Sequence, residues 1–249
     1  MTIPDGSTPS DTTFASLRGA TGFLTILGGS GTPTAGAMSW FPAVGAALGA
    51  LVGAVWWASG ELWPPLLAAI VAVSADAVLT GALHHDGLGD AADGLLPHMD
   101  RARRLEVMRT PDVGTFGIMA LMTTTLIQAG SLASMDARPA LIAGLWCASR
   151  TTMAVTARTV PYARTSGIAT SFLGGSAAVV GVAGIALAAG LATWAAGWSG
   201  LAAVAAVVLA AAGVVGLAFR RIGGFTGDVL GAAGVVGQSA GLLVAAARW

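Results

Sequence analysis

Lysine is absent from the chain, and charged side chains make up only 10% of its 249 residues. Twelve arginines balance twelve acidic residues, so the formal net charge is zero. A chain without an excess of basic residues lacks the charge that holds proteins to nucleic acids, and no nucleic-acid partner is expected. A single cysteine, Cys147, excludes an intramolecular disulfide, and its apolar surroundings indicate a small buried side chain.

Hydrophobic residues, in contrast, make up 55% of the chain and are gathered in long runs. A helix that spans a bilayer needs roughly 17 to 25 largely apolar residues. The runs show no alternation of polar and apolar residues, so they favour helices over a barrel. The sequence therefore predicts an all-α fold, a polytopic integral helix bundle in a lipid bilayer. About seven transmembrane helices are expected, at residues 38–59, 62–83, 115–134, 139–159, 173–195, 199–219 and 229–247.

The start of the chain differs from the rest, because it is too poor in apolar residues to form a core. Residues 1–34 are predicted to be a polar N-terminal segment, with a short interfacial helix that begins within Phe23–Leu27. Residues 35–249 show no internal repeat and are predicted to be a single transmembrane helical domain. Glycine-rich late segments such as Gly231–Gly237 suit close helix packing, within one chain or in a homo-oligomer.

The arginines are unevenly distributed over the expected connections. With the N-terminus in the cytoplasm, only Arg138 and Arg248 fall on the opposite side. The cytoplasmic side then carries Arg18, Arg101, Arg103, Arg104, Arg109, Arg158, Arg164, Arg220 and Arg221. This bias predicts a multi-pass protein of the plasma (inner) membrane. Three polar loops, at 84–113, 161–167 and 220–228, converge at its cytoplasmic face.

The first of these loops opens with the acidic stretch HHDGLGDAADG at 84–94. Asp86, Asp90 and Asp93 are spaced i, i+4 and i+7, so on a helix their carboxylates line one stripe. Such a stripe can hold Mg²⁺, which bridges carboxylates and substrate phosphates. A solvated connecting loop is the alternative. Three aspartates so close to the end of an apolar segment favour the metal site.

Histidine and arginine side chains flank these aspartates. His84 is a candidate acid or base, or a donor to a phosphate. A zinc site is not favoured, because adjacent histidines face different sides of a helix and no HExxH or cysteine pattern is present. Arg101, Arg103 and Arg104 fit a positive-inside anchor and phosphate binding equally well. Arg109, close to a GTFG sequence, is the better phosphate ligand.

Two charged residues, Asp76 and Arg150, lie inside predicted spans. Charge within a membrane is costly and indicates function. These two residues either pair with each other, or Asp76 supports the acidic site, because it shares a helix face with Thr80 and His84. A transporter would use them as an ion or proton path, but the polar residues are concentrated at one face of the membrane, which argues against transport.

The acidic stretch at 84–94, together with MRTPDVGTFGIMAL at 108–121, resembles the cobalamin synthase family, the adenosylcobinamide-GDP ribazoletransferases. Three further stretches are similar to motifs of that family: WFPAVGAALG at 40–49, PYAR at 161–164 and GGFTGDVLGA at 223–232. They occur in the family's order and extend the resemblance over nearly the whole chain.

The resemblance implies a Mg²⁺-dependent transferase. It would join α-ribazole, or its 5′-phosphate, to adenosylcobinamide-GDP and release GMP, with residues 35–249 as the catalytic domain. The expected metal ligands are Asp86, Asp90, Asp93 and Asp228. The same four aspartates and His84 form the expected catalytic set, in which Asp228 completes the metal cage or accepts the proton of the attacking hydroxyl. The expected substrate ligands are Arg109, Arg150, Tyr162, Arg164 and Thr226.

The chain also departs from the family pattern. An arginine and a proline usual after Phe-Leu are replaced in TILG at 25–28, and Val235 and Gln238 stand where the family tends to carry glutamates. A membrane CDP-alcohol or prenyl-type phosphotransferase is the alternative enzyme. The CDP-alcohol pattern continues Asp-Gly-x-x-Ala-Arg, whereas Asp93-Gly94 is followed by LLPHMD, which argues against it.

Overall fold

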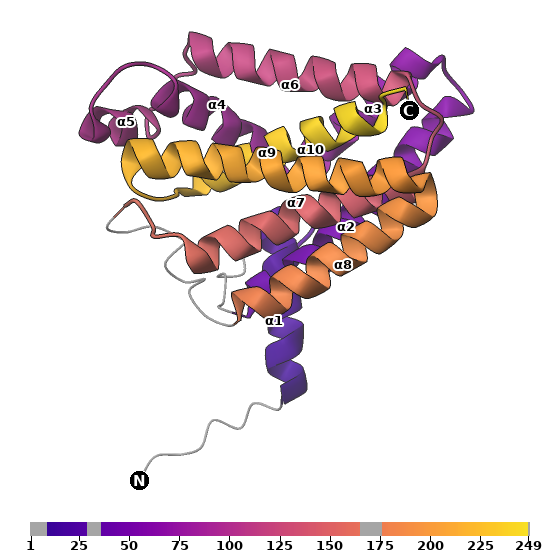
Figure 1. The fold of residues 1–249 in the computed structure, drawn as a ribbon, viewed down its shortest axis with the longest axis horizontal. Coiled ribbons are helices and arrows are strands. Elements are labelled where there is room, and N and C mark those ends of the chain that lie inside the picture. Colours follow the sequence, from indigo (N-terminus) through magenta and orange to yellow (C-terminus); the bar gives the residue numbers. More distant parts are fainter. Residues whose placement is uncertain (1–8, 29–35, 165–175, 249) are drawn as a thin grey trace.

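The computed structural model describes residues 9–28, 36–164 and 176–248, and this part of the chain is helical, with one isolated bridge. Most of the long helices run along the longest axis of the molecule, and α1 projects from the bundle (Figure 1). This confirms the predicted all-α bundle. The helices are α1 (Pro9–Leu24), the 3-10 helix η1 (Ala37–Trp40), α2 (Phe41–Gly60), α3 (Pro65–Leu79), α4 (Leu83–Leu95), α5 (Arg101–Val107), α6 (Thr115–Ala133), α7 (Pro139–Thr159), α8 (Ala177–Ala196), α9 (Trp198–Ile222) and α10 (Gly227–Ala245).

Local sequence signals set several helix boundaries. α3 and α7 begin at Pro65 and Pro139, because proline has no amide hydrogen to leave unpaired in the first turn. Asp100 caps α5 by accepting a hydrogen bond from the amide of Arg103 at 2.9 Å. α9 ends at Gly223, whose φ of 79° is accessible to glycine at little cost.

The number of spans differs from the prediction. In the described part of the chain, five helices are long and apolar enough to cross a membrane, namely Ala37–Gly60, α6, α8, α9 and α10. α3 and α4 are bent by 89° and provide a sixth crossing if they form one broken span. The expectation of about seven transmembrane helices is therefore corrected to five or six.

Two expected spans account for the difference. The span expected at 62–83 stops at Leu79, and left-handed backbone at Gly81 and Ala82 turns the chain into α4. The span expected at 139–159 is present as helix α7, but its serines, threonines and arginines make it less apolar than the other long helices. α7 lies at the centre of the bundle, where fifteen of its 21 residues are buried against α2, α8 and α10.

The N-terminal helix lies earlier in the chain than expected. No helix begins within Phe23–Leu27; α1 begins at Pro9 and ends at Leu24. Its residues Leu17, Ala20 and Leu24 recur at helical spacing and pack into the core against η1 and α2. These few apolar residues hold the helix to the bundle. The sequence did not predict this helix, because the segment as a whole is polar.

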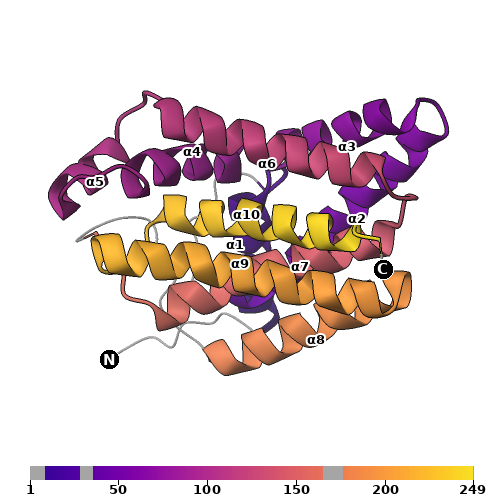
Figure 2. The ribbon, with the colours of Figure 1, turned by 45° about the horizontal axis from the view of Figure 1, so that its top comes forward.

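The two ends of the bundle differ in composition. One end carries α5, the start of α6, the end of α7 and the α9–α10 connection (Figures 1 and 2). We call it the arginine end and define it as residues 96–114, 160–164 and 220–228. The other end carries the α2–α3, α6–α7 and α8–α9 turns. We call it the tryptophan end for its four exposed tryptophans, Trp57, Trp63, Trp194 and Trp198. Exposed tryptophans are typical of a membrane interface.

Candidate active site

Three segments that are distant in sequence meet at the arginine end. The amide of Ala163 donates to the carbonyl of Phe225 at 2.8 Å, and the amide of Phe225 donates to the carbonyl of Pro161 at 2.9 Å. Arg101 ties α5 to both segments, because its Nε donates to the carbonyl of Ile222 at 2.7 Å and its Nη2 to that of Ala163 at 2.9 Å. For the described residues, this confirms the predicted convergence of the three polar loops.

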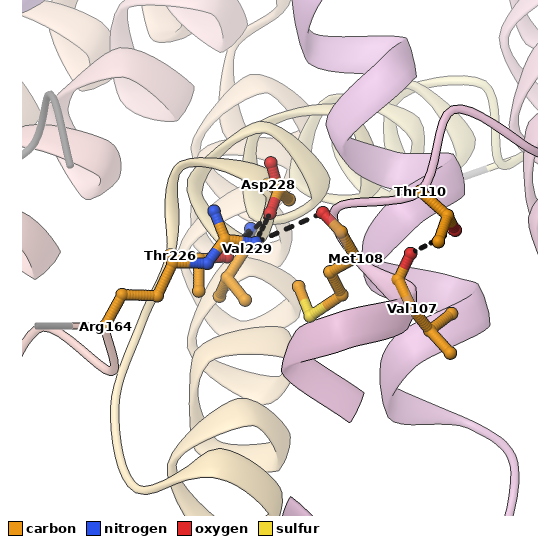
Figure 3. Close-up of polar contacts among 7 residues, drawn as sticks. All are labelled: Val107, Met108, Thr110, Arg164, Thr226, Asp228 and Val229. Carbon is orange, nitrogen blue, oxygen red and sulfur yellow. Dashed lines mark hydrogen bonds and ion pairs between the residues drawn. The ribbon is translucent and has the colours of Figure 1, made fainter. Parts of the chain in front are cut away.

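Asp228 lies at the start of α10 and is held by two side chains (Figure 3). Its Oδ2 accepts hydrogen bonds from Nη2 of Arg164 at 2.9 Å and from the hydroxyl of Thr226 at 3.1 Å. The same guanidinium nitrogen of Arg164 donates to the carbonyl of Met108 at 3.1 Å. Thr226 also caps α10 by accepting from the amide of Val229 at 3.3 Å. The contacts fix Asp228 relative to α5 and to the Arg164 segment.

The other two residues expected to bind substrate in these loops have structural contacts. Thr226 is fully buried, and its hydroxyl is engaged by the contacts just described. Tyr162 is half-buried, and its ring packs edge-on against that of Phe225, with ring centroids 5.4 Å apart. Thr226 therefore stabilises the start of α10, and Tyr162 packs its segment against the α9–α10 connection.

The predicted acidic helix is present as α4, on which the three aspartates differ in exposure. Asp86 is exposed, Asp90 is half-buried and Asp93 is buried. Asp228 and Asp86 are both close enough to Asp90 to interact with its charge. The helices approach closely at Gly87, where an added Cβ would lie 3.0 Å from the Cα and the carbonyl oxygen of Asp228. A glycine between Asp86 and Asp90 thus allows a fourth carboxylate to lie beside them.

Asp93 points away from this group toward the start of α6. Its Oδ2 accepts a hydrogen bond from the amide of Gly114 at 2.6 Å, and its Oδ1 accepts one from the amide of Gly117 at 2.9 Å. Gly114 and Gly117 are the two glycines of the GTFG sequence. The acidic motif and the GTFG motif are therefore joined directly.

The carboxylates suit a magnesium ion by their chemistry. Among the described residues, no three His, Cys, Asp or Glu side chains are placed to hold a metal together. Mg²⁺ does not require such a cage, because it usually binds through one or two carboxylates and keeps waters or substrate phosphates as its remaining ligands. Asp86, Asp90 and Asp228 offer hard oxygen donors of this kind, and a bound cation would relieve the repulsion among their charges.

An arginine-lined groove is connected to this acidic group through Arg164, which lines the groove and pairs with Asp228. Its volume is about 450 Å³, and its lining includes Arg101, Arg109 and Arg164, with Glu106 as the only carboxylate. Guanidinium groups bind phosphate oxygens through paired hydrogen bonds. The predicted ligands Arg109 and Arg164 are thus brought together, and Arg101, for which the sequence left two roles open, joins them.

Two other arginines of α5 have different contacts. Arg104 is buried, and its Nη1 donates to the carbonyls of Gly94 at 2.8 Å and Leu95 at 2.9 Å. These carbonyls end α4 and would otherwise be unpaired. Arg103 pairs with Glu106 at 2.8 Å on the surface. For Arg104, the structure therefore identifies a role in packing that the sequence did not suggest.

Asp76 and Arg150, which were predicted inside spans, are buried, and so is His84, which was predicted in the first polar loop. His84 is buried, and neither of its ring nitrogens has a hydrogen-bond partner in the described structure. Arg150 is fully buried, and its Nη1 donates to the hydroxyl of Ser149 at 3.0 Å. No ion pair joins Asp76 to Arg150 in the described part of the chain. Instead, Asp76 accepts a hydrogen bond from Nε1 of Trp146 at 2.7 Å.

Gln238 is buried beside these residues. With its amide oxygen turned toward them, it accepts from Nη1 of Arg150 and from Nε1 of Trp146, both at 3.0 Å. Val235 lies in the apolar core. Ten residues along α10 correspond to about 15 Å of helix, so Gln238 lies well away from Asp228. The departures from the family pattern at Val235 and Gln238 thus affect the interior more directly than the acidic group.

The fold and this end of the bundle define a polytopic membrane protein with carboxylates from two helices and an arginine-lined groove. Residues 16–246 match the family described as Cobalamin-5-phosphate synthase, and the chain belongs to this family. It is 39% identical to the adenosylcobinamide-GDP ribazoletransferase of Bradyrhizobium diazoefficiens over 252 residues, 94% of each chain. It is 40% identical to those of Brucella ovis and Brucella canis over 217 residues, 82% of each chain. No solved structure matches the chain.

Proposed function

We propose that this protein is an adenosylcobinamide-GDP ribazoletransferase, which catalyses the last joining step of cobalamin synthesis. A hydroxyl of α-ribazole, or of its 5′-phosphate, attacks the diphosphate; a new phosphorus–oxygen bond forms, the bond to GMP breaks, and the hydroxyl proton is removed. Membership of the family and the names of the relatives support this reaction. The structural observation that carries it is the group formed by Asp86, Asp90 and Asp228 beside the arginine-lined groove.

The aspartates would hold magnesium and the arginines the phosphates. One or two of Asp86, Asp90 and Asp228 would bind the ion directly. The bound ion would supply positive charge to offset the charge that develops on the diphosphate. Arg109 is exposed in the groove and suits the departing GMP or the phosphate of the ribazole. Arg164 keeps Asp228 in place, so that this carboxylate either completes the metal site or accepts the hydroxyl proton.

We keep as proposals the predicted roles of His84 in catalysis and of Arg150 in substrate binding, although neither residue lies at the arginine end. Both are buried, and direct contact with substrate would require the substrate to enter the bundle. Neither ring nitrogen of His84 is bonded to the described protein, which leaves the ring able to exchange a proton or to donate a hydrogen bond.

We further propose that the arginine end faces the cytoplasm of a plasma (inner) membrane. The α5 arginines, together with Arg158, Arg164, Arg220 and Arg221, lie in or next to the polar connections that meet there. Positive residues are retained on the cytoplasmic side.

The reaction is tested with purified protein in detergent, supplied with adenosylcobinamide-GDP and α-ribazole or its 5′-phosphate. Product formation should require Mg²⁺, and Asp90→Asn should lower kcat/KM by about 100-fold at fixed Mg²⁺, because a metal-binding charge is lost. Asp136→Asn is the matched control, since Asp136 is exposed in the α6–α7 turn at the tryptophan end.

Full Mg²⁺-dependent turnover by folded Asp90→Asn would overturn the metal assignment. Absence of product from folded wild-type protein would reject the proposed reaction. It would favour a CDP-alcohol or prenyl-type phosphotransferase instead, with transport as the remaining class.

A further inference from the structure

Asp93 differs from the other acidic residues of α4 in what its oxygens contact. Each carboxylate oxygen accepts a hydrogen bond from one backbone amide at the start of α6: the amide of Gly114 at 2.6 Å and that of Gly117 at 2.9 Å. The side chain is 8% exposed. Helix N-termini present amides without partners in their own helix, together with a partial positive charge. Asp93 therefore caps α6 from a different helix.

We propose that Asp93 is a positioning residue that locks the GTFG sequence and the preceding loop against α4, and that it does not hold the metal. The expected effect on substrate binding rests on the function proposed above. The contact itself, which we call the lock, rests only on the two hydrogen bonds from Gly114 and Gly117 to Asp93.

The glycines of GTFG are explained by this contact. A Cβ added at Gly114 would lie 2.5 Å from Oδ1 of Asp93, and one added at Gly117 would collide with Oδ2. Only residues without a side chain allow both amides to reach the carboxylate. The two motifs therefore form one structural unit.

The lock holds the far end of the loop that begins with Arg109. The loop that carries it leaves α5 at Met108 and enters α6 at Gly114. Arg164 holds the first end through the carbonyl of Met108, and Asp93 holds the second. With both ends fixed, Arg109 lines the groove beside the carboxylates.

The exposure of the three aspartates separates their roles. Asp86 is exposed and Asp90 is half-buried, so water and substrate can reach them, whereas Asp93 is buried with both oxygens engaged. Because both of its oxygens are engaged by amides of α6, Asp93 has the least freedom of the three to bind a cation.

Hydrogen–deuterium exchange tests the lock without any substrate. Asp93→Asn keeps the shape but replaces one acceptor by an amide that cannot accept a hydrogen bond, so exchange at Gly114 and Gly117 should be at least tenfold faster. Gly117→Ala keeps every carboxylate and should have the same effect. Asp90→Asn, whose side chain lies one turn away, should leave exchange at these amides unchanged.

Metal binding and kinetics test the role. Mn²⁺, used as a probe for Mg²⁺, should bind to Asp93→Asn and Gly117→Ala within twofold of wild type, and at least tenfold more weakly to Asp90→Asn. In turnover, both lock variants should raise KM for adenosylcobinamide-GDP about tenfold, because Arg109 is displaced, with the Mg²⁺ concentration at half-maximal rate unchanged. The double variant should be no worse than either single variant, since both break the same contact.

Loss of Mn²⁺ binding in Asp93→Asn together with normal binding in Gly117→Ala would overturn the proposal, and so would unchanged exchange at the two amides. If wild-type protein makes no cobalamin product, the proposed reaction fails, but the exchange and Mn²⁺ measurements still decide the role of Asp93. If Asp93→Asn does not fold, Gly117→Ala carries the test, because normal exchange or weakened Mn²⁺ binding in this variant would overturn the lock.

Discussion

The arginines on and just after the short helix α5 have different roles. Arg104 pairs with the last carbonyls of α4 inside the protein, Arg103 forms a surface ion pair, and Arg109 follows the helix and lines the groove. The first role concerns stability and the last concerns binding. Substitution by methionine separates them, since it keeps much of the length of the side chain and removes the charge.

Arg104→Met should lower the free energy of unfolding by about 2–3 kcal/mol, because two buried carbonyls lose their donor. Arg109→Met should leave the unfolding temperature unchanged and lower kcat/KM at least tenfold. Arg103→Met is the control and should change stability by less than about 1 kcal/mol, as expected for a surface pair. Thermal unfolding in detergent and steady-state kinetics measure the three variants. A stable Arg104→Met protein would show that its two hydrogen bonds contribute little.

The sequence singled out candidate residues but not their contacts. The aspartates of α4 were identified from their spacing, and Arg164 and Asp228 from the resemblance to the cobalamin synthase family; their roles stay predictions. Asp76 was expected to pair with Arg150 or to support the acidic site. No ion pair joins it to Arg150 in the described part of the chain, and it accepts a hydrogen bond from Trp146. A neutral partner such as Trp146 or Gln238 gives no signal in the sequence, because it looks like an ordinary residue of an apolar helix.

At the level of elements, α4 depends on its glycines in ways that differ from one position to the next. Gly87 touches the backbone of Asp228, whereas an added Cβ at Gly89 would meet nothing closer than the side chain of Leu121 at 3.6 Å. The space beside Gly87 is filled by the start of α10. Helix spacing of this kind is set by long-range packing that local sequence does not show.

Alanine substitutions at these two positions should therefore act in opposite directions. Gly87→Ala should destabilise the protein by about 1–3 kcal/mol and reduce activity, because α10 and Asp228 must shift. Gly89→Ala should be neutral or stabilise by up to about 1 kcal/mol, since alanine favours the helix and fits. Unfolding temperature and kcat of the two proteins give the comparison. Equal effects would show that the α4–α10 contact is not tight at Gly87.

At the level of the whole molecule, the bundle has one arginine-rich and one tryptophan-rich end, and its only cysteine is buried. Arg103 is exposed at the first end, and Glu61 is exposed in the turn after α2 at the second. Hydropathy predicted a membrane bundle, and the arginines predicted which loops meet. Hydropathy overcounted the spans, because the bent pair α3–α4 and the polar central helix α7 each occupy a length of sequence that resembles a full crossing.

Single added cysteines can report the orientation, because Cys147 is fully buried and should not react. A membrane-impermeant maleimide should label Glu61→Cys in intact cells, and Arg103→Cys only after the membrane is permeabilised. The unsubstituted protein serves as the control for Cys147. The reverse pattern would place the arginine end outside the cell and contradict the proposed orientation.

The central position of α7 has a consequence for how the chain is made. A helix with a buried arginine gains little from contact with lipid, and an arginine at the centre of a spanning helix costs about 2.5–3.5 kcal/mol during insertion. α7 is synthesised after α2 and before α8 and α10, the helices that surround it. The polar side chains of α7 are therefore buried only after α8 and α10 have also been synthesised. We infer that α7 reaches its final surroundings late in the assembly of the bundle.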